Sequence, residues 1–192
     1  MAENLLVAEK KFLGPLIVDI GIGEGGDYLE HLPKGSIYIG IDTSVEKLKK
    51  LKILYKDVIS MRADAHNLPF NDGSIDQLRM YFPSGKLLSG LQDELISIEW
   101  FQELSRVLKP GGNLVIWGDN LANIPLLIKM LIENSRKSFN LVYNVALTAD
   151  QLQSIGTEHS KSVAEGMKQN KDTGYQVQGR QIVLQKPPEL NS

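Results

Sequence analysis

The sequence contains no cysteine among its 192 residues. Disulfide bonds and thiolate metal sites are therefore excluded. The 3 histidines, His31, His66 and His159, are far apart along the chain, so we expect no zinc site and no bound metal. The chain also lacks an apolar run near the roughly 20 residues of a membrane helix, and it lacks the basic start of a secretory signal. These absences predict a cytoplasmic protein with no membrane partner.

Excess positive charge is missing as well. Lysine and arginine number 21 against 23 aspartates and glutamates, which gives a formal net charge of −2. Proteins that bind nucleic acid through its phosphates usually have a basic excess, so RNA binding here would depend on a local patch. The length predicts a single domain over residues 1–186, followed by a short tail at residues 187–192.

Short apolar runs alternate with helical patterns along the chain. Seven runs are typical of strands, at residues 16–20, 37–42, 58–61, 76–82, 113–118, 139–146 and 180–184. Apolar residues recur every three or four positions over 95–108, which predicts a helix that ends at Lys109-Pro110-Gly111-Gly112, and a second helix is predicted over 125–135. The alternation predicts a three-layer α/β fold with a seven-stranded, mostly parallel sheet whose last strand is antiparallel.

The first predicted strand ends in a glycine-rich turn, with glycines at positions 21, 23, 25 and 26. Glycines at a strand-to-helix turn let a ligand approach the backbone, and the spacing also satisfies the dinucleotide fingerprint. The turn by itself therefore fits either a dinucleotide or S-adenosyl-L-methionine. Asp19 favours the second ligand, because its carboxylate would attract the amino group of a methionine moiety and repel a pyrophosphate.

A second carboxylate follows the next predicted strand. Asp42 lies about twenty residues after the turn, where an acidic side chain can accept hydrogen bonds from both ribose hydroxyls. Thr43 and Ser44 follow it directly, so Asp42 is equally well interpreted as a turn or cap residue. The third predicted strand leads into a further acidic segment, Ala63-Asp64-Ala65, and then into Leu68-Pro69-Phe70.

Taken in order, these segments resemble the successive motifs of class I S-adenosylmethionine-dependent methyltransferases. The similar segments are residues 18–25, 40–42, 63–65 with 68–70, and 108–112, which together extend over more than half of the chain. The resemblance implies the fold and the cofactor of that family. It also treats residues 108–112 as a structural turn that lies outside the active site.

Roles for individual residues follow from the same resemblance. It implies that Gly21, Gly23 and Gly25 adjoin the methionine end of the cofactor and that Asp42, with Thr43, holds the ribose. Asp64 would bind the adenine amino group, and the Ala65 amide would bind a ring nitrogen. The catalytic segment, Phe82-Pro83-Ser84, would border the methyl group and the acceptor.

Residues 81–88 carry the information on the acceptor. This segment resembles the Phe-Pro-Trp-Gly motif of the 16S rRNA adenine-N1 methyltransferases that confer aminoglycoside resistance, and also the Phe-Pro-Asp-Pro motif of the tRNA guanine-N7 methyltransferases. Ser84 stands where the first family has a tryptophan that stacks on a flipped base. If the acceptor needs a general base, Tyr81, Ser84 and Lys86 are the candidates.

Lysines predict where an RNA acceptor would bind. Five of them fall on residues 47–56, and we place Lys49 and Lys50, with Lys86, in the substrate site. A solvated helix face explains the same pattern equally well. The sequence thus predicts a methyltransferase acting on a base nitrogen in structured RNA, either rRNA or tRNA. A small-molecule acceptor is the alternative, and a non-catalytic nucleotide-binding protein is a third hypothesis.

Overall fold

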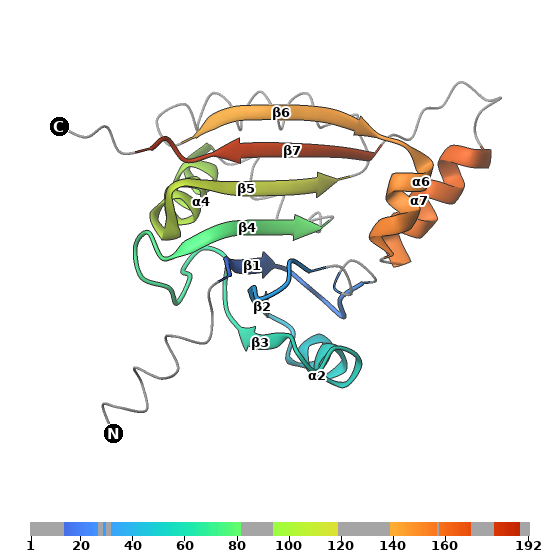
Figure 1. Ribbon diagram of the computed structural model, residues 1–192, viewed down its shortest axis with the longest axis horizontal. Coiled ribbons are helices and arrows are strands. Elements are labelled where there is room, and N and C mark those ends of the chain that lie inside the picture. The colour runs from blue at the N-terminus through green and yellow to red at the C-terminus, as the bar shows by residue number, and fades with distance from the viewer. Residues whose placement is uncertain are drawn as a thin grey trace.

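The computed structural model describes residues 14–26, 29, 32–81, 94–118, 139–156, 158–169 and 179–188. Seven strands within these ranges form one sheet in the order β3-β2-β1-β4-β5-β7-β6 (Figure 1). Their bounds are β1 Leu16–Ile20, β2 Ile37–Asp42, β3 Ile59–Arg62, β4 Ile75–Tyr81, β5 Leu108–Gly118, β6 Asn140–Leu147 and β7 Gly179–Gln185. The helices are α2 Val45–Leu54, α4 Glu94–Val107, α6 Ala149–Ile155 and α7 Glu158–Gln169.

The pairing of the strands confirms the predicted fold. Strands β3, β2, β1, β4 and β5 are mutually parallel, whereas β7 pairs antiparallel with both β5 and β6. The order of the strands reverses beside β1, because β2 lies on one side of it and β4 on the other. In open sheets of this kind, ligands bind at the carboxyl ends of the strands next to such a reversal.

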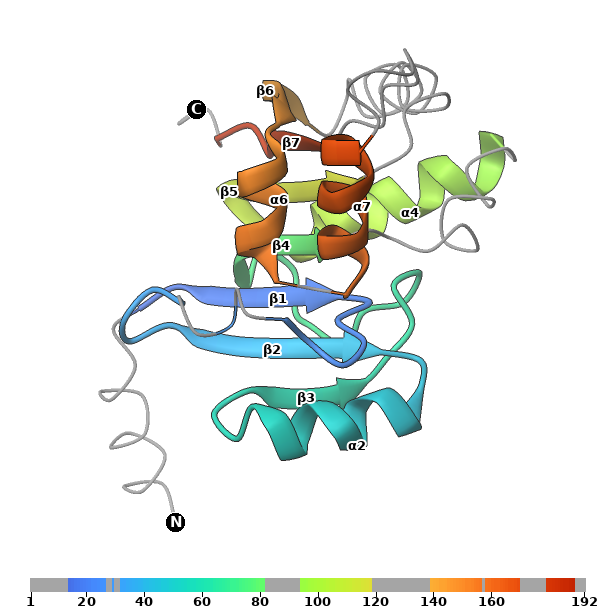
Figure 2. The same cartoon turned by 90° about the vertical axis from the view of Figure 1, so that its right-hand side faces the viewer.

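Helices cover both faces of the sheet. Phe101 and Leu104 of α4 pack with Val18, Leu78 and other apolar side chains on one face. The opposite face is covered by α2, through Leu48 and Leu51, and by α6 and α7. Helices α6 and α7 lie together near the carboxyl ends of β4 and β5 (Figures 1 and 2). None of the helices in the described part of the chain is long and apolar enough to span a membrane.

The segment Lys109-Pro110-Gly111-Gly112 differs from its prediction. It was expected to be a turn before the fifth strand, but β5 begins at Leu108 and includes it. The pairing with β4 is irregular here, with a register shift between Ile75 and Gln77. Gly111 has a positive φ of 78°, and its amide donates to the Lys186 carbonyl at 3.0 Å. The segment is therefore the bulged start of a strand, held to the end of β7.

The interval between the last two strands contains two helices, α6 and α7. Helix α6 starts with a capping box, in which the Gln151 amide donates to Thr148 Oγ1 at 3.2 Å and the Thr148 amide donates to Gln151 Oε1 at 2.8 Å. The helix predicted over residues 125–135 lies outside the described residues.

Candidate functional site

The glycine turn, residues 21–26, leaves β1 at the reversal of strand order. The amides of Gly21 and Ile22 both donate to the Ile41 carbonyl of β2, at 2.8 and 3.0 Å. Gly21, Gly23 and Gly25 have φ angles of 71°, 61° and 86°, which L side chains rarely adopt. The turn is therefore bonded to β2, and its course depends on glycine.

The three glycines differ in what surrounds them. Among the described residues, a Cβ atom at Gly21 would meet no heavy atom within 4 Å, and one at Gly23 would meet only the Lys47 side chain, at 4.0 Å. A Cβ atom at Gly25 would lie 2.8–2.9 Å from the side chains of Leu29, Leu51 and Tyr55. Gly21 and Gly23 thus leave an open cradle along the backbone, whereas Gly25 is needed for packing against α2. The expected contact of Gly25 with the cofactor stays a prediction.

Asp42 lies at the carboxyl end of β2 and fastens two segments. Its Oδ2 accepts a hydrogen bond from the Gly23 amide at 3.0 Å, and its Oδ1 accepts one from the Ser44 amide at 2.8 Å. An ionised carboxylate offers about four lone-pair positions, so acceptor capacity remains for a ribose. Both interpretations of Asp42 therefore have a structural basis, since it shapes the turn and faces the cradle. Thr43 beside it is exposed.

Asp19 is fully buried, with 0% of its surface exposed. Its Oδ2 accepts a hydrogen bond from the Tyr38 hydroxyl at 2.8 Å. Burial, and then the nearby Asp19 charge, raise the pKa of Tyr38, so the hydroxyl stays protonated and donates. Asp19 pairs in register with Arg79 of β4, whose guanidinium lies 5.8 Å from the centre of the Tyr38 ring. Asp19 lies in β1, two residues before Gly21, and its direct contact with the cofactor amino group stays a prediction.

The acidic segment after β3 forms a compact turn. The His66 amide donates to Asp64 Oδ1 at 2.9 Å, and the His66 ring nitrogen Nδ1 lies 2.8 Å from the same oxygen. These bonds, the amide first, lower the pKa of the Asp64 carboxyl, which therefore stays ionised and ready to accept from an amino group. Ala65 is buried, 5% exposed. His66 is exposed.

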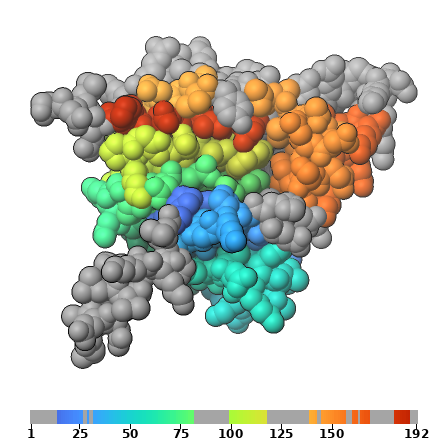
Figure 3. All heavy atoms as spheres, viewed as in Figure 1, coloured from blue at the N-terminus to red at the C-terminus, as the bar shows by residue number. Residues whose placement is uncertain are grey.

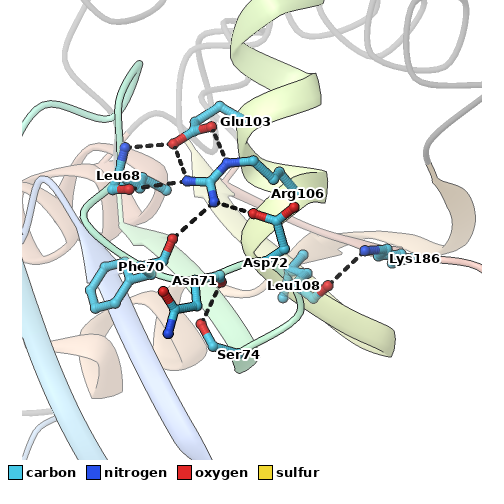
Figure 4. Close-up of polar contacts among 9 residues, drawn as sticks. All are labelled: Leu68, Phe70, Asn71, Asp72, Ser74, Glu103, Arg106, Leu108 and Lys186. Carbon is cyan, nitrogen blue, oxygen red and sulfur yellow. Dashed lines mark hydrogen bonds and ion pairs between the residues drawn. The ribbon is translucent and has the colours of Figure 1, made fainter.

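The loop from β3 to β4, residues 63–74, is fastened to α4 by two side chains (Figure 4). Arg106 donates to the carbonyls of Phe70 at 2.9 Å and Leu68 at 3.1 Å, and to Asp72 Oδ1 at 2.6 Å. Glu103 accepts from the Leu68 amide at 2.6 Å and from Arg106 at 2.7 and 2.8 Å. We call Arg106 and Glu103 the loop clamp. The sequence analysis did not find it.

The clamp makes stability depend on pH. Hydrogen bonds from Arg106 hold the pKa of the Glu103 carboxyl below its usual range. Because folding lowers this pKa, the stabilisation is present above the unfolded value of about 4.3 and is lost as the pH falls through the folded value. We expect Glu103→Gln to unfold at lower urea concentration than the unmodified chain at pH 7, and the difference to shrink below about pH 4.

Urea titrations at several pH values measure this difference. Glu99→Gln is the matched control, since Glu99 lies exposed on the same helix and its variant should follow the unmodified chain. A difference between Glu103→Gln and the unmodified chain that widens toward acid would contradict the assignment.

An aromatic pair marks the carboxyl ends of β4 and β5. The rings of Tyr81 and Trp117 are stacked, with centroids 4.2 Å apart and an angle of 4° between the planes. Burial, and then the charge of Asp19, raise the pKa of Tyr81 against an opposing effect of Arg79, so this hydroxyl stays protonated. Trp100 is buried, 4% exposed.

The lysines predicted to bind substrate have different surroundings. Lys47, Lys49, Lys50 and Lys52 are all exposed on α2, which lies at the lower end of the view in Figures 1 and 3. Lys50 forms an ion pair at 2.9 Å with Glu24 of the glycine turn. Lys49 is thus the better candidate for an external partner. Phe82, Pro83, Ser84 and Lys86 lie outside the described residues.

The described side chains therefore fit one ligand with separate polar parts. The cradle at Gly21 and Gly23, the carboxylate of Asp42 and the turn at Asp64 follow β1, β2 and β3, at one edge of the sheet. No group of three or more metal-ligating side chains occurs among the residues that the structure describes. The arrangement is suited to binding and orienting a nucleoside that carries an amino-acid moiety.

Comparison with known proteins agrees with this arrangement. Residues 18–116, just over half of the chain, match the family described as "Methyltransferase domain". A demethylmenaquinone methyltransferase of Corynebacterium kroppenstedtii is 29% identical over 113 residues, which are 59% of this chain and 45% of the relative. The chain thus spans less than half the length of the curated relatives it matches.

Solved structures extend the likeness to nearly the whole chain. A methyltransferase from Methanosarcina mazei, named as dependent on S-adenosylmethionine, has a TM-score of 0.62 and 21% identity, over 95% of this chain and 98% of its own. The 16S rRNA methyltransferase KamB has a TM-score of 0.70 and 13% identity, over 98% of this chain and 94% of its own. At these identities the likeness concerns the fold.

Proposed function

Since this chain belongs to the methyltransferase domain family, we propose that it is an S-adenosylmethionine-dependent methyltransferase and that it methylates a ring nitrogen of a base in structured RNA. When bound, S-adenosylmethionine supplies a methyl group that its sulfonium sulfur already activates. The protein has to hold the cofactor, orient the acceptor and exclude water. In this proposal Gly21 and Gly23 adjoin the methionine moiety, Asp42 accepts from the ribose hydroxyls, and Asp64 accepts from the adenine amino group.

The observation that carries the RNA proposal is the position of the lysines on α2. Lys47 lies beside the glycine turn, because its side chain is the neighbour that a Cβ atom at Gly23 would meet. Lys49 and Lys52 are exposed on another side of the same helix, three residues apart. Exposed lysines so placed can hold the phosphates of a folded RNA while one base enters the site. This local patch is present although the chain as a whole is slightly acidic.

Tyr81 is the one candidate base that lies within the described residues, and its state supports an acceptor that needs no base. Its hydroxyl stays protonated, and Trp117, its neighbour in the stack, offers only a donor nitrogen. A ring nitrogen with a free lone pair can attack a methyl group without prior deprotonation. A catechol, or an amine in its ammonium form, would first have to lose a proton.

A small aromatic acceptor is the second candidate. The curated relatives are named demethylmenaquinone methyltransferases. In addition, the ion pair between Lys50 and Glu24 makes one of the exposed lysines of α2 less available for an RNA phosphate. In this alternative the aromatic pair of Tyr81 and Trp117 would lie near a flat ring, and α6 and α7 would limit its size.

Transfer of a labelled methyl group distinguishes the two candidates. We expect the purified chain to label small ribosomal subunits or bulk tRNA from methyl-tritiated S-adenosylmethionine, with the label in a single base after nuclease digestion. A lipid extract that contains demethylated quinols is the parallel acceptor. Label in the quinol fraction, with none in either RNA pool, would replace the RNA proposal by the alternative.

Reversing charge on α2 tests the RNA surface. Lys49→Glu combined with Lys52→Glu is expected to weaken RNA binding strongly and to reduce the slope of log K against log salt by about 0.9 per lost phosphate contact. Filter binding at several salt concentrations measures both quantities. Lys34→Glu is the matched control, an exposed lysine in the turn that precedes β2. Equal weakening in the control would reduce the effect to one of net charge.

A further inference from the structure

Arg106 uses its whole hydrogen-bonding capacity within the clamp. A guanidinium has five N–H donors, and five hydrogen bonds leave this one. Nε donates to Glu103 Oε2, Nη1 donates to the Phe70 carbonyl and to Asp72, and Nη2 donates to the Leu68 carbonyl and to Glu103 Oε1. All five donors of the Arg106 side chain are therefore used in intramolecular hydrogen bonds, although 32% of the side chain is exposed.

The bonds of the clamp converge on one short segment. Leu68 is held at both polar backbone atoms, since its amide donates to Glu103 and its carbonyl accepts from Arg106. The backbone of α4 adds two more bonds, because the amides of Gly73 and Ser74 donate to the carbonyls of Arg106 and Val107, at 2.8 and 2.9 Å. Residues 68–74 are thus fixed against the end of α4 by backbone contacts that a change of loop sequence would leave in place.

The fixed segment lies directly after the residues assigned to the adenine ring. The Asn67 amide donates to the Asp64 carbonyl at 3.1 Å, which closes the turn that carries Asp64 and Ala65. Ala65 and Leu68 are both buried in the core cluster that includes Phe101 and Leu104 of α4. A shift of Leu68 would therefore move Asp64 as well, because one tight turn joins the two residues and because Ala65 and Leu68 pack in the same apolar cluster.

We propose that Arg106, together with Glu103, is a positioning residue for adenine recognition. It acts by fixing the loop at residues 63–74, so that the Asp64 carboxylate and the Ala65 amide point at the base, and it does not touch the cofactor itself. The inference rests on the proposed role of Asp64 and Ala65. Lysine cannot take over this task, because its ammonium group is a single point with three donors, whereas the clamp requires a planar fork.

The test compares two cofactor products that differ at the polar edge of the base. S-adenosylhomocysteine carries the 6-amino group from which Asp64 would accept and a ring nitrogen N1 that can accept, whereas S-inosylhomocysteine carries an oxygen at position 6 and an N–H at N1. Isothermal titration of both with the full chain gives their affinity ratio. In Arg106→Gln we expect the affinity for S-adenosylhomocysteine to fall about tenfold, close to the loss of one charged hydrogen bond, and the affinity for S-inosylhomocysteine to change little. Arg106→Lys should not restore the ratio.

Lys109→Gln is the matched control. Lys109 is the second residue of β5, which follows α4, and it forms an ion pair with Asp76 at 2.7 Å, while Asp76 in turn accepts from the Leu16 amide. Its loss removes a cation at the same end of α4 without touching residues 63–74. We expect this variant to keep the affinity ratio. Deuterium exchange over residues 63–74 should accelerate in Arg106→Gln and stay unchanged in Lys109→Gln.

The outcomes separate the inference from its premise. If Asp64→Ala leaves the ratio of the two affinities intact, the adenine assignment is wrong. If Asp64→Ala collapses the ratio and Arg106→Gln does not, the assignment stands and the positioning role is wrong. Should Arg106→Gln fail to fold, Glu103→Gln takes its place, since it keeps the side-chain shape and a carbonyl acceptor. Equal loss of affinity for both ligands would mean that the clamp is structural only.

Discussion

Replacing Asp42 with alanine is expected to weaken the binding of S-adenosylmethionine and S-adenosylhomocysteine by at least about a hundredfold. Two effects combine in this variant. The ribose loses its acceptor, and the Gly23 amide, which donates to Asp42 at 3.0 Å, loses the bond that holds the cradle in place. Each hydrogen bond to a charged group contributes about 1.5–3 kcal/mol, and each 1.4 kcal/mol corresponds to about a tenfold change in affinity.

Isothermal titration measures this loss, and the shift of melting temperature by saturating S-adenosylhomocysteine gives a second readout. Ser44→Ala controls for instability. The Ser44 hydroxyl caps α2 by accepting from the Lys47 amide. Its loss costs about 1 kcal/mol of stability, and Ser44 lies only two residues after Asp42. We expect Ser44→Ala to lower the melting temperature and to keep the ligand-induced shift. A shift of normal size in Asp42→Ala would disprove the assignment of the ribose site.

Gly21→Ala is expected to abolish most cofactor binding while leaving the protein folded. The residue has a φ of 71°, so an alanine costs about 1–2 kcal/mol of stability through its backbone conformation. Its Cβ atom would meet no atom of the described residues within 4 Å and would project into the open cradle. The methyl group therefore occupies space that the cofactor needs, and we expect affinity for S-adenosylhomocysteine to fall by more than about tenfold.

Gly35→Ala is the control that isolates the ligand effect. Gly35 has a φ of 81°, and a Cβ atom there would also meet no atom within 4 Å in the part of the chain that the structure describes. It lies in the turn before β2, at the end of that strand opposite to the glycine turn. The two variants should lose similar stability in urea titrations, and only Gly21→Ala should lose cofactor affinity. Equal affinity in both would show that the space above Gly21 is not the cofactor site.

The parts of the site that could be predicted from the sequence are local in the chain. The position of Asp42 followed from an acidic residue directly after an apolar run, because parallel strands end at one edge of the sheet. The fold followed from the alternation of strands and helices in the same way. The bulged start of β5 was missed, because proline and glycine usually mark a turn, and only its bonding to Lys186 makes this segment part of the sheet.

The clamp could not be found from the sequence, because most of its contacts join positions more than thirty residues apart. Arg106 donates to the backbone carbonyls of Leu68 and Phe70. Because every residue has a backbone carbonyl, the sequence does not indicate which carbonyls accept these bonds. The bond between Asp19 and Tyr38 escaped for the same reason, since it crosses two strands. The start of α6 did carry a usable signal, because Thr148 and Gln151 have the spacing of a capping box.

The place of β7 in the sheet has a consequence for biosynthesis. This strand lies between β5 and β6 and is the last strand of the described chain to leave the ribosome. Until it is made, β5 presents an unpaired edge and β6 has no neighbour in the sheet. Such edges can pair with those of other chains. A nascent chain that has already formed the cofactor cradle at β1 and β2 therefore keeps these edges unpaired until β7 is synthesised. A stop codon before residue 179 would leave the edges unpaired permanently, and the truncated chain would be prone to aggregation.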